Sequence, residues 1–337
     1  MHDNAGMTSE ALERRGLWSR YWATGMAHSC GTSYDSTYGG AIGDFWRDSF
    51  ATLAAGDRVL DIATGNGALP RLLLSLRPHA SVEIDAVDMA QVAPTWPLQL
   101  DPPQRQRLRI HSGVSAESLP FADHRFGLVV SQYGIEYADL SLAVPEALRV
   151  LAPGGRIRFL VHHTLARPVV LAGHEIEHID WLLQPDGLAD LAAAMIEPMV
   201  RATTAEGRSS LATDAAANQQ RQRFNDLQAA LKLRLQAAAC PDVLHEARDW
   251  IARMFALAPS GGVAGCRQAL DQIRDALVDS RQRLLDLRQH ALDETAIRQF
   301  CDHLGQAGLK ASATPLSDQG HLLGWTVCGD PGALMPA

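Results

Sequence analysis

The chain has 337 residues, 47% of them hydrophobic, which predicts about two domains with ample material for a core. Its 30 Lys and Arg against 38 Asp and Glu give a formal net charge of -8, so we expect no nucleic-acid partner, because such binding needs a basic surface. Five scattered cysteines without a CxxC pair argue against a disulfide framework or structural zinc, and without a signal peptide or bilayer-length apolar run we expect a cytoplasmic protein with no membrane span.

Residues 1–50 precede the first predicted strand and are rich in aromatic residues and glycine. The pattern predicts a helix over residues 9–24, then a loop, then a helix that ends near Phe50. Two interpretations stay open for this segment. It either packs on the domain as a structural element or covers a ligand pocket as a lid.

The most informative stretch is Val59-Leu60-Asp61-Ile62-Ala63-Thr64-Gly65-Asn66-Gly67. An apolar strand leads into an acidic residue and a glycine turn, and a leucine-rich helix follows. This arrangement places backbone N–H groups in front of a ligand, and Gly65 and Gly67 permit a close approach. A short glycine motif is weak evidence by itself, so an ordinary strand-to-helix turn is the alternative.

Further strands follow in the next hundred residues. Residues 81–89 predict a second strand that ends in Asp88, close to the spacing of about 20 residues at which an acid meets ribose hydroxyls. Residues 126–134 and 157–161 predict two more strands, with a helix and the turn Pro153-Gly154-Gly155 between them. Strands and helices that alternate in this way are typical of a parallel sheet covered on both faces.

Two stretches between the second strand and residue 126 predict loops. Residues 92–103 are rich in proline, and the Arg residues between 105 and 109 indicate a solvated segment.

Residues 166–292 are rich in Ala, Leu, Gln and Arg and nearly free of strand signals, which predicts several helices. Apolar residues recur there at helical spacing, in two stripes: Phe224, Leu227 and Leu231, and then Leu270, Ile273, Leu277, Leu284 and Leu287. Such stripes need a partner helix. Either a helical hairpin within the chain or a homodimer seam would provide one.

The same block holds His174-Glu175-Ile176-Glu177-His178, which fits the H-E-x-x-H pattern of zinc proteases. No third ligand follows at a recognised spacing, and the surrounding strand pattern is not that of such a protease. We therefore expect a solvated or pocket-edge helix here and no metal site.

The strand pattern returns near the end of the chain. Residues 294–307 predict a helix that ends at Gly308, and residues 310–316 and 321–328 predict a pair of strands around a turn.

These segments, in this order, resemble the class I S-adenosylmethionine-dependent methyltransferases, and most of all their ubiquinone/menaquinone-type small-molecule branch. The matching motifs are VLDIATGNG, AVDMA, SAESLPF, VVSQYGIEY and RVLAPGGRI. The resemblance implies an α/β fold, with a Rossmann-like sheet that is mostly parallel and has a C-terminal antiparallel hairpin, plus an all-helical insertion. We expect an N-terminal helical lid segment at 1–50, the methyltransferase domain at 51–165 and 293–337, and a helical cap at 166–292.

The resemblance also implies S-adenosyl-L-methionine as cofactor and a set of residues around it. Those expected at its methionyl part and ribose are Asp61, Ala63, Gly65, Asn66, Gly67 and Asp88. Those expected at the adenine are Met89, Ser115, Ala116 and Glu117, and those beside the methyl donor are Ser131 and Gln132. Two of these depart from the family pattern, since Ala63 replaces a common glycine and Ser115 replaces an adenine-facing Asp.

The methyl acceptor is expected outside the carboxyl ends of the strands. Candidate catalytic residues there are His162, His163 and Tyr133, because a histidine suits general-base chemistry at neutral pH. Candidate substrate-binding residues are Glu136 and Tyr137 after the fourth strand, and His28, Tyr34 and Tyr38 from the N-terminal segment. For either strand-end histidine, a hydrogen bond to backbone is the alternative role.

The sequence thus predicts in-line methyl transfer to a small, apolar or aromatic acceptor, which the N-terminal segment and the helical insertion would cover. Two alternatives stay open. One is a protein or RNA methyltransferase that uses the helical block for docking, and the other is a non-catalytic regulatory protein that keeps the cofactor fold.

Overall fold

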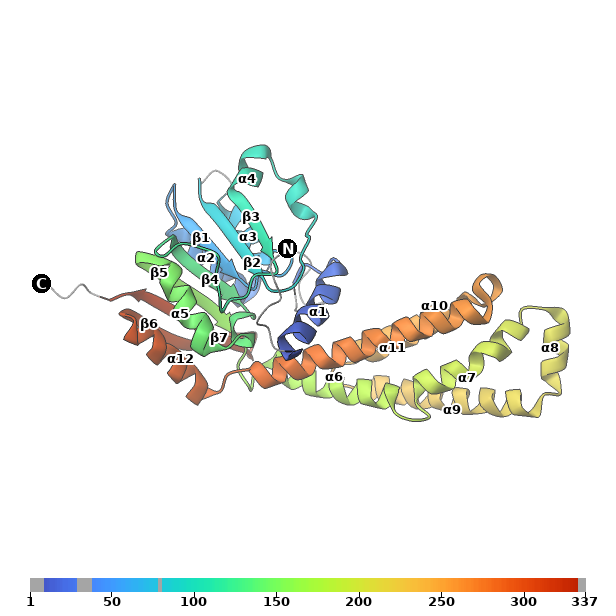
Figure 1. The fold of residues 1–337 in the computed structure, drawn as a ribbon. Coiled ribbons are helices and arrows are strands. Elements are labelled where there is room, and N and C mark those ends of the chain that lie inside the picture. Colours follow the sequence, from blue (N-terminus) through green and yellow to red (C-terminus); the bar gives the residue numbers. More distant parts are fainter. Residues whose placement is uncertain (1–8, 29–37, 78–80, 333–337) are drawn as a thin grey trace, which may run out of the picture. The chain divides into compact units, whose positions relative to one another are not determined.

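The computed structural model describes residues 9–28, 38–77 and 81–332 (Figure 1). Contacts divide the chain into two compact units, one formed by residues 1–169 with 289–337 and the other by residues 170–288. The first unit contains the sheet and the second unit is helical. The separate lid segment expected at 1–50 and the domain boundaries given above stay predictions.

The first unit is built on a seven-stranded sheet with the order β3-β2-β1-β4-β5-β7-β6. Strands β1 to β5 pair in parallel, and β7 runs antiparallel to both β5 and β6. The strands are β1 (Arg58–Ile62), β2 (Glu83–Asp88), β3 (Leu108–Ser112), β4 (Phe126–Gln132), β5 (Leu151–Val161), β6 (Leu309–Asp318) and β7 (His321–Pro331). The predicted Rossmann-like sheet with its C-terminal antiparallel hairpin is confirmed.

Helices cover both faces of this sheet (Figure 1). The helices of this unit are α1 (Ser9–Ala23), α2 (Gly40–Ala51), α3 (Ala68–Leu76), α4 (Pro102–Arg107), α5 (Leu140–Val150) and α12 (Glu294–Gln306), with short 3-10 turns η2 (Trp96–Gln99) and η3 (Ile135–Tyr137). Because successive strand residues point to opposite faces, Leu128 and Val130 of β4 pack with α2 and α3, whereas Val129 packs with α5 and α12. One buried core therefore packs on each face of the sheet, and together they fix the positions of the strand ends.

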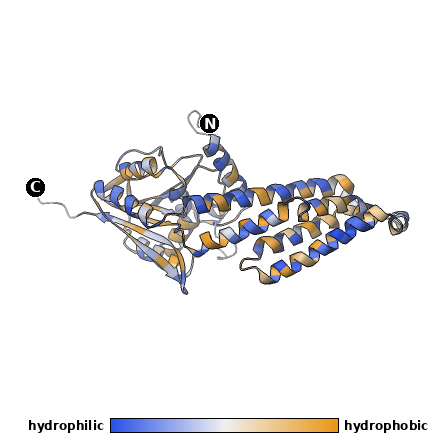
Figure 2. Ribbon diagram, turned by 90° about the horizontal axis from the view of Figure 1, so that it is seen from below, coloured by the Kyte–Doolittle hydropathy of each residue, from blue (hydrophilic) through white to orange (hydrophobic). Residues whose placement is uncertain are grey.

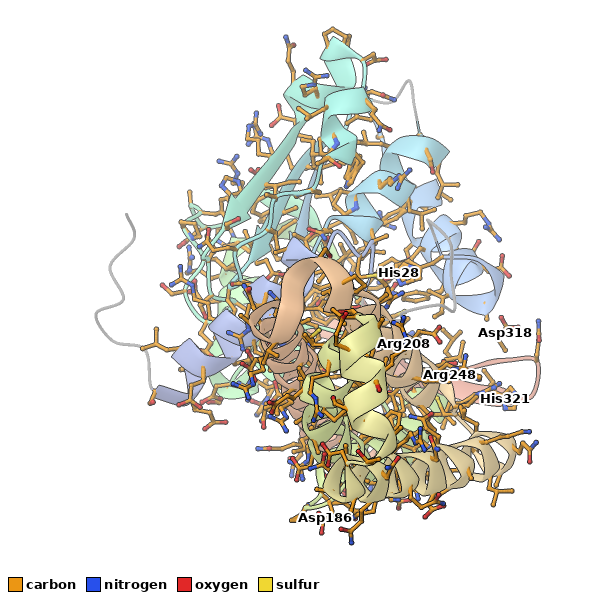
Figure 3. The ribbon with its side chains drawn as sticks, turned by 90° about the vertical axis from the view of Figure 1, so that its right-hand side faces the viewer. His28, Asp186, Arg208, Arg248, Asp318 and His321 are labelled. Carbon is orange, nitrogen blue, oxygen red and sulfur yellow. The ribbon has the colours of Figure 1, made fainter. Side chains whose placement is uncertain are left out.

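The hairpin at the end of the chain also holds the N-terminal part of the fold. Asp318 and His321 pair at the tip of β6 and β7 (Figure 3). The Asp318 carboxylate accepts a hydrogen bond from Ala41 N at 3.2 Å, at the start of α2.

The prediction of loops was right for residues 92–95 but wrong for residues 102–109, which form α4 and the start of β3. The side chain of Asp101 caps α4 by accepting a hydrogen bond from Gln104 N at 2.7 Å, and the two prolines suit the first turn of that helix. Residues 108–112 form the edge strand β3, which pairs with β2. The sequence did not reveal this strand because it is polar: Arg109 forms an ion pair and His111 a hydrogen bond with acidic residues of β2 instead of entering the core.

The turn predicted before the fifth strand lies inside it. Between β4 and β5 the pairing passes from Phe126–Leu151 directly to Leu128–Arg156. The intervening residues bulge out around Gly154, whose φ of 76° lies in the left-handed region that favours glycine.

The second unit consists of helices, as predicted for this block. Its helices are α6 (Arg167–Leu183), α7 (Leu188–Arg201), α8 (Ala205–Ala212), α9 (Ala215–Ala237), α10 (Asp242–Ala256) and α11 (Ala258–His290). Hydrophobic and hydrophilic residues alternate along these helices (Figure 2), as expected where one side of each helix is buried. Gly262, with a φ of 56°, interrupts α11 with a kink.

The apolar stripes of this unit are packed within the chain. Leu231, Leu270, Ile273 and Leu277 are buried in one cluster with residues of α6, α7 and α10. A homodimer through these helices stays a prediction. Among the described residues, every helix is too short or too polar to span a bilayer.

Candidate functional site

The turn between β1 and α3 has the backbone shape that its glycines permit. Gly65 and Gly67 have φ values of 54° and 80°. Side chains crowd both positions, since a Cβ on Gly65 would lie 2.5 Å from the Trp22 ring and one on Gly67 would lie 3.1 Å from the Trp96 ring. Ala63 also has a positive φ, 58°, at the position where the family pattern has glycine. The turn therefore needs small residues both for its backbone conformation and for close packing.

Two buried carboxylates stand at the ends of the adjacent strands β1 and β2. Asp88 accepts hydrogen bonds from Gly65 N at 2.7 Å and Ala90 N at 2.8 Å, so it holds the glycine turn against β2. Asp61 is 2% exposed, and its Oδ2 has no hydrogen-bond partner among the described residues. An unpaired buried carboxylate oxygen is costly, so its presence points to a ligand that donates hydrogen bonds or carries positive charge.

Burial raises the pKa of both carboxyl groups. Loss of hydration raises the pKa of Asp61 from 3.8 to about 8, and the neighbouring Asp88 adds to the rise. Loss of hydration also raises the pKa of Asp88 to about 6, against the lowering effect of its hydrogen bonds to Ala90 N and Gly65 N. Nearby positive charge would reverse these shifts by favouring the ionised carboxylates.

Asn66 ties the glycine turn to the N-terminal segment. Its side-chain amide donates to Trp22 O at 3.0 Å and Met26 O at 2.7 Å, while Oδ1 is buried without a partner among the described residues. Trp96 Nε1 donates to Asn66 O at 2.8 Å.

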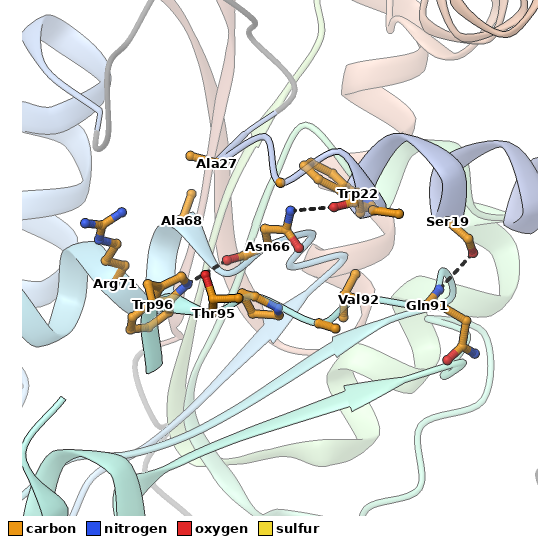
Figure 4. A pocket seen from close by; sticks show the side chains of 14 residues that line it. Ser19, Trp22, Ala27, Asn66, Ala68, Arg71, Gln91, Val92, Thr95 and Trp96 are labelled. Atoms are coloured by element: carbon orange, nitrogen blue, oxygen red, sulfur yellow. Dashed lines mark hydrogen bonds between the residues drawn. The ribbon is translucent and has the colours of Figure 1, made fainter. Parts of the chain in front are cut away.

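A cavity of about 540 Å³ opens between these elements, lined by the end of α1, the first turn of α3 and residues 91–96 (Figure 4). The Asn66 side chain and the Trp22 and Trp96 rings all face this cavity.

The segments expected at the adenine lie at the ends of β2 and β3. Val114 N donates to Asp88 O at 2.9 Å, which brings residues 114–117 beside β2. Ser115 Oγ accepts from Glu117 N at 3.2 Å, and Glu117 Oε1 accepts from Asp139 N at 2.9 Å. Met89, Ser115, Ala116 and Glu117 are all half-buried, so part of each surface is accessible.

Ser131 and Gln132 end β4, next to β1. Ser131 is fully buried and donates to Ile62 O at 2.8 Å, a structural role that fastens the two strand ends. Gln132 Oε1 accepts a hydrogen bond from Trp46 Nε1 of α2. The amide nitrogen of Gln132 is buried without a partner among the described residues, so it is available as a donor to a ligand.

A second buried polar group lies at the ends of β4 and β5. Glu136 Oε1 accepts from His162 N at 3.0 Å and lies 2.8 Å from His162 Nδ1. The side chains are 0% and 5% exposed. The Tyr133 ring stacks on the His162 ring at 4.2 Å, and Tyr133 OH donates to Leu323 O at 3.1 Å.

Aromatic rings connect this histidine to the glycine turn. Tyr137 meets His162 edge-on with 6.1 Å between ring centroids, and Trp18 meets Tyr137 at 5.9 Å. Trp18 in turn stacks on Trp22 at 5.8 Å, and the Trp22 ring lies against Gly65. The carboxyl edge of the sheet therefore carries one aromatic wall that runs from the predicted methionyl end of the cofactor to His162.

The other predicted acceptor-site residues have different surroundings. His163 stacks on Trp325 at 4.5 Å, and its Nδ1 accepts from Leu165 N at 2.9 Å. Burial lowers the pKa of His163, so its neutral form is favoured. His28 and Tyr38 are buried with their rings 5.1 Å apart, and Tyr34 lies outside the described residues.

The H-E-x-x-H segment lies on α6. His178 is buried and accepts a hydrogen bond from Arg234 Nε at 2.9 Å. Glu175 instead joins Cys240 and Asp242, whose possible ligand atoms lie within 4.8 Å of one another. The Cys240 thiol donates to Glu175 at 3.0 Å, and burial raises its pKa to about 12, so this group is satisfied as a protonated thiol. The expected absence of a metal site stays a prediction.

Sequence reasoning missed the residues of α1 as part of this site. Trp18 and Trp22 are spaced four apart on that helix, and such spacing places two rings on one face. The spacing therefore indicates an aromatic face on this helix. That this face contacts Gly65 is known only from the position of α1 in the structure.

Part of this domain is similar to known methyltransferases. A family profile described as "Methyltransferase domain" matches residues 60–159. The ubiquinone/menaquinone biosynthesis C-methyltransferase UbiE of Geotalea daltonii is 34% identical over 113 residues, which cover 33% of this chain and 48% of that protein. The demethylmenaquinone methyltransferase of Thermus thermophilus is 35% identical over 117 residues, covering 33% of this chain and 51% of that protein. The chain thus spans about half the length of these curated relatives.

Among solved structures, the YcgJ protein of Bacillus subtilis is 27% identical, with a TM-score of 0.32, over 41% of this chain and 58% of that chain. The resemblance drawn from the sequence motifs is confirmed by the family profile and the curated relatives.

Proposed function

We propose that the protein is an S-adenosylmethionine-dependent methyltransferase acting on a small apolar or aromatic molecule, since residues 60–159 match the methyltransferase profile. The observation that carries this proposal is the set of buried polar atoms left without partners at the carboxyl ends of β1 and β4. Within the described residues, these atoms are Asp61 Oδ2, Thr64 Oγ1 and Asn66 Oδ1 after β1, and Gln132 Nε2 and Glu136 Oε2 after β4.

The unpaired atoms fit the chemistry of the cofactor. Asp61 Oδ2 and Asn66 Oδ1 are acceptors and suit its ammonium group, whereas the Gln132 amide is a donor and suits its carboxylate. Asp88 stands where an acid meets ribose hydroxyls in a βαβ unit, and Gly65 and Gly67 keep side chains out of the way. When bound, S-adenosylmethionine supplies a methyl group on a positively charged sulfur, which is already activated for transfer. The protein then contributes position, exclusion of water and a proton acceptor.

The acceptor class follows from the aromatic wall. Trp18, Trp22 and Tyr137 are each half-buried, so their rings keep accessible surface beside the glycine turn. Flat apolar molecules pack well on such rings. The names of the two relatives given above refer to ubiquinone, menaquinone and demethylmenaquinone, and they support an aromatic quinone-type acceptor.

A non-catalytic regulatory role is less well supported. An acceptor side lined only by aliphatic residues would favour it, whereas the described residues at the ends of β4 and β5 include the pair Glu136 and His162. Neither group is needed for cofactor binding alone.

The proposal is tested by thermal unfolding with S-adenosylhomocysteine, the demethylated product, and with NAD as the control. Ligand that binds the native state must stabilise it, by about 2.7 kcal/mol at a hundredfold excess over Kd. We expect S-adenosylhomocysteine to raise the Tm and NAD to leave it unchanged. The opposite pattern would mean that the glycine turn serves a dinucleotide and that the proposed function is wrong.

A further inference from the structure

We propose that Glu136 is a positioning residue that holds His162 as the proton acceptor of the reaction, so that the methyl acceptor must be a nucleophile bearing an ionisable hydrogen. This inference rests on the proposed function and deepens it. Glu136 was first expected to bind substrate directly, and its contacts give it a different role.

The geometry of the pair is that of a carboxylate fixing an imidazole. One oxygen of Glu136 lies within hydrogen-bond distance of both the backbone nitrogen and Nδ1 of His162, at 3.0 and 2.8 Å. Both side chains are almost fully excluded from solvent. A carboxylate can only accept, so Nδ1 carries the hydrogen and the lone pair of the neutral ring is on Nε2.

Neighbouring elements hold the ring in this orientation. Tyr133 stacks on one face of the imidazole at 4.2 Å, and the edge-on contact with Tyr137 is on a different side. Leu292 N donates to His162 O at 2.8 Å, which fastens the backbone at the same residue.

Two other polar groups of this region contact Tyr137. Arg14 donates to Tyr137 O at 3.2 Å, and the His290 ring stacks on the Tyr137 ring at 5.3 Å. The carboxylate that contacts the His162 ring is that of Glu136. The ring is fixed before any ligand arrives.

The proton balance of the reaction requires such a group. The nucleophile forms a bond to the methyl carbon while the carbon–sulfur bond breaks, and that bonding pair stays on sulfur, which becomes a neutral thioether. A nucleophile that carried a hydrogen then has one proton to lose, and His162 Nε2 accepts it. The carboxylate of Glu136 stabilises the resulting imidazolium across the Nδ1–H bond.

This role narrows the acceptor class. A base is useful only if the acceptor group has a hydrogen to lose, such as a phenolic hydroxyl. The aromatic wall favours a flat ring, so we assign a hydroxylated aromatic compound as the substrate class.

The first test reads the tautomer of His162 by nitrogen NMR of the full-length protein with S-adenosylhomocysteine. We expect the Nδ1–H form in the wild type. Glu136→Gln should keep it, because the amide oxygen must stay toward His162 N, and the same oxygen then accepts from Nδ1. Glu136→Ala should give a mixture of tautomers. An Nε2–H form in the wild type, or an unchanged tautomer in Glu136→Ala, overturns the positioning role.

The second test measures methyl transfer to 1,4-dihydroxynaphthalene, with 1,4-dimethoxynaphthalene as the matched compound that lacks an ionisable hydrogen. We expect transfer to the diol only. Glu136→Gln should lower kcat about tenfold and Glu136→Ala about a hundredfold, with KM changed less than threefold. Glu146→Gln is the control, because Glu146 also accepts from a backbone nitrogen, Leu119 N, and a side chain, Arg149, away from this site. It should leave kcat unchanged.

The outcomes separate the two proposals. Equal transfer to both compounds, or no transfer to the diol by a protein that binds S-adenosylhomocysteine, overturns the assigned acceptor class. A rise in KM with unchanged kcat in Glu136→Gln overturns the positioning role and returns Glu136 to substrate binding. Failure to bind S-adenosylhomocysteine contradicts the proposed function itself.

Discussion

The two ends of the candidate site differ in how their buried polar atoms are satisfied. At β1 and β2, Asp61 has an unpaired oxygen and a raised pKa, and Asp88 has only the backbone as partner. At β4 and β5, Oε1 of Glu136 is already bonded to His162, whose ring stacks on Tyr133, and only Oε2 of Glu136 is left without a partner among the described residues. The unpaired atoms at β1 and β2 destabilise the folded protein until a ligand bonds to them. The hydrogen bonds between Glu136 and His162, in contrast, exist before a ligand binds.

This difference separates binding from chemistry. A site with unpaired carboxylates gains most from a ligand that carries positive charge, so its variants should lose affinity. A pair whose members are already hydrogen-bonded to each other should matter little for cofactor affinity and much for turnover. The predictions below test that separation.

The largest effect is expected from replacing residues 170–288, the whole helical unit, with a short linker. All the motifs expected to hold the cofactor lie before His162, so binding of S-adenosylhomocysteine should persist, while transfer to the native acceptor should be lost with the predicted cap. Calorimetry and turnover of the shortened and full-length proteins decide this. Full turnover by the shortened protein would mean that the helical unit serves only stability or assembly. A shortened protein that folds but does not bind S-adenosylhomocysteine would mean that the helical unit contributes part of the cofactor site.

Asp88→Ala should weaken cofactor binding by roughly 1–3 kcal/mol, because it leaves ribose hydroxyls and two backbone N–H groups unpaired. Asp293→Ala is the matched control, since Asp293 also accepts from two backbone nitrogens, Thr295 N and Ala296 N, at the start of α12. That control should lower the Tm and leave affinity unchanged. Unchanged affinity in a folded Asp88→Ala protein would remove Asp88 from the site.

Asp61→Asn should change the pH dependence of both stability and binding. Between pH 4 and 8 the native state keeps a proton on Asp61 that the unfolded chain has released, so wild-type stability contributed by this group falls as the pH rises through that range. Asparagine removes this loss, so the variant should gain Tm relative to wild type at pH 8.5 and not at pH 4.

The same variant should bind S-adenosylmethionine with little pH dependence. In the wild type, affinity should rise from pH 6 to pH 8.5, since the cationic ligand favours the ionised carboxylate. Thermal scans and calorimetry at three pH values measure both effects. Parallel pH profiles for the two proteins would show that Asp61 does not titrate in this range.

Ala63→Gly should have the smallest effect. Glycine relieves the positive φ of 58° at this position, but it also gains freedom in the unfolded chain, so stability should change by about 1 kcal/mol or less. Gln319→Gly, at a φ of 50° in the β6–β7 turn, measures the same backbone effect away from the site. A large change in cofactor affinity for Ala63→Gly alone would show that the methyl group of Ala63 contacts the ligand.

The grouping of the residues expected to hold the cofactor could be predicted from sequence because its determinants are local. The apolar strand, Asp61 and the two glycines lie within nine residues, and Asp88 ends the next strand along the chain. Parallel pairing of β1 and β2 then brings them together without further information. The edge strand β3 was missed because its polar residues find charged partners on β2 instead of a place in the core.

The acceptor end could be predicted only as separate residues. Glu136 and His162 were both named, but their pairing depends on the register of β4 against β5, which shifts by several residues at the Gly154 bulge. The contact of Trp22 with Gly65 likewise depends on where α1 is placed. Neither the bulge nor the helix placement has a local sequence signal strong enough to fix it.

The backbone at Leu292 has a consequence for how the long helical unit is tolerated. Leu292 N donates to His162 O at 2.8 Å, and Thr164 N donates to Leu292 O at 3.2 Å, so the points where the chain leaves the sheet and returns to it are fastened together. Trp325 Nε1 also donates to Leu292 O at 3.0 Å. The sheet itself therefore closes the loop, and the entropy of closure grows only slowly with loop length, by about 0.6 kcal/mol per doubling. Helical segments of quite different lengths could be exchanged at this point while the strand end that presents His162 stays where it is.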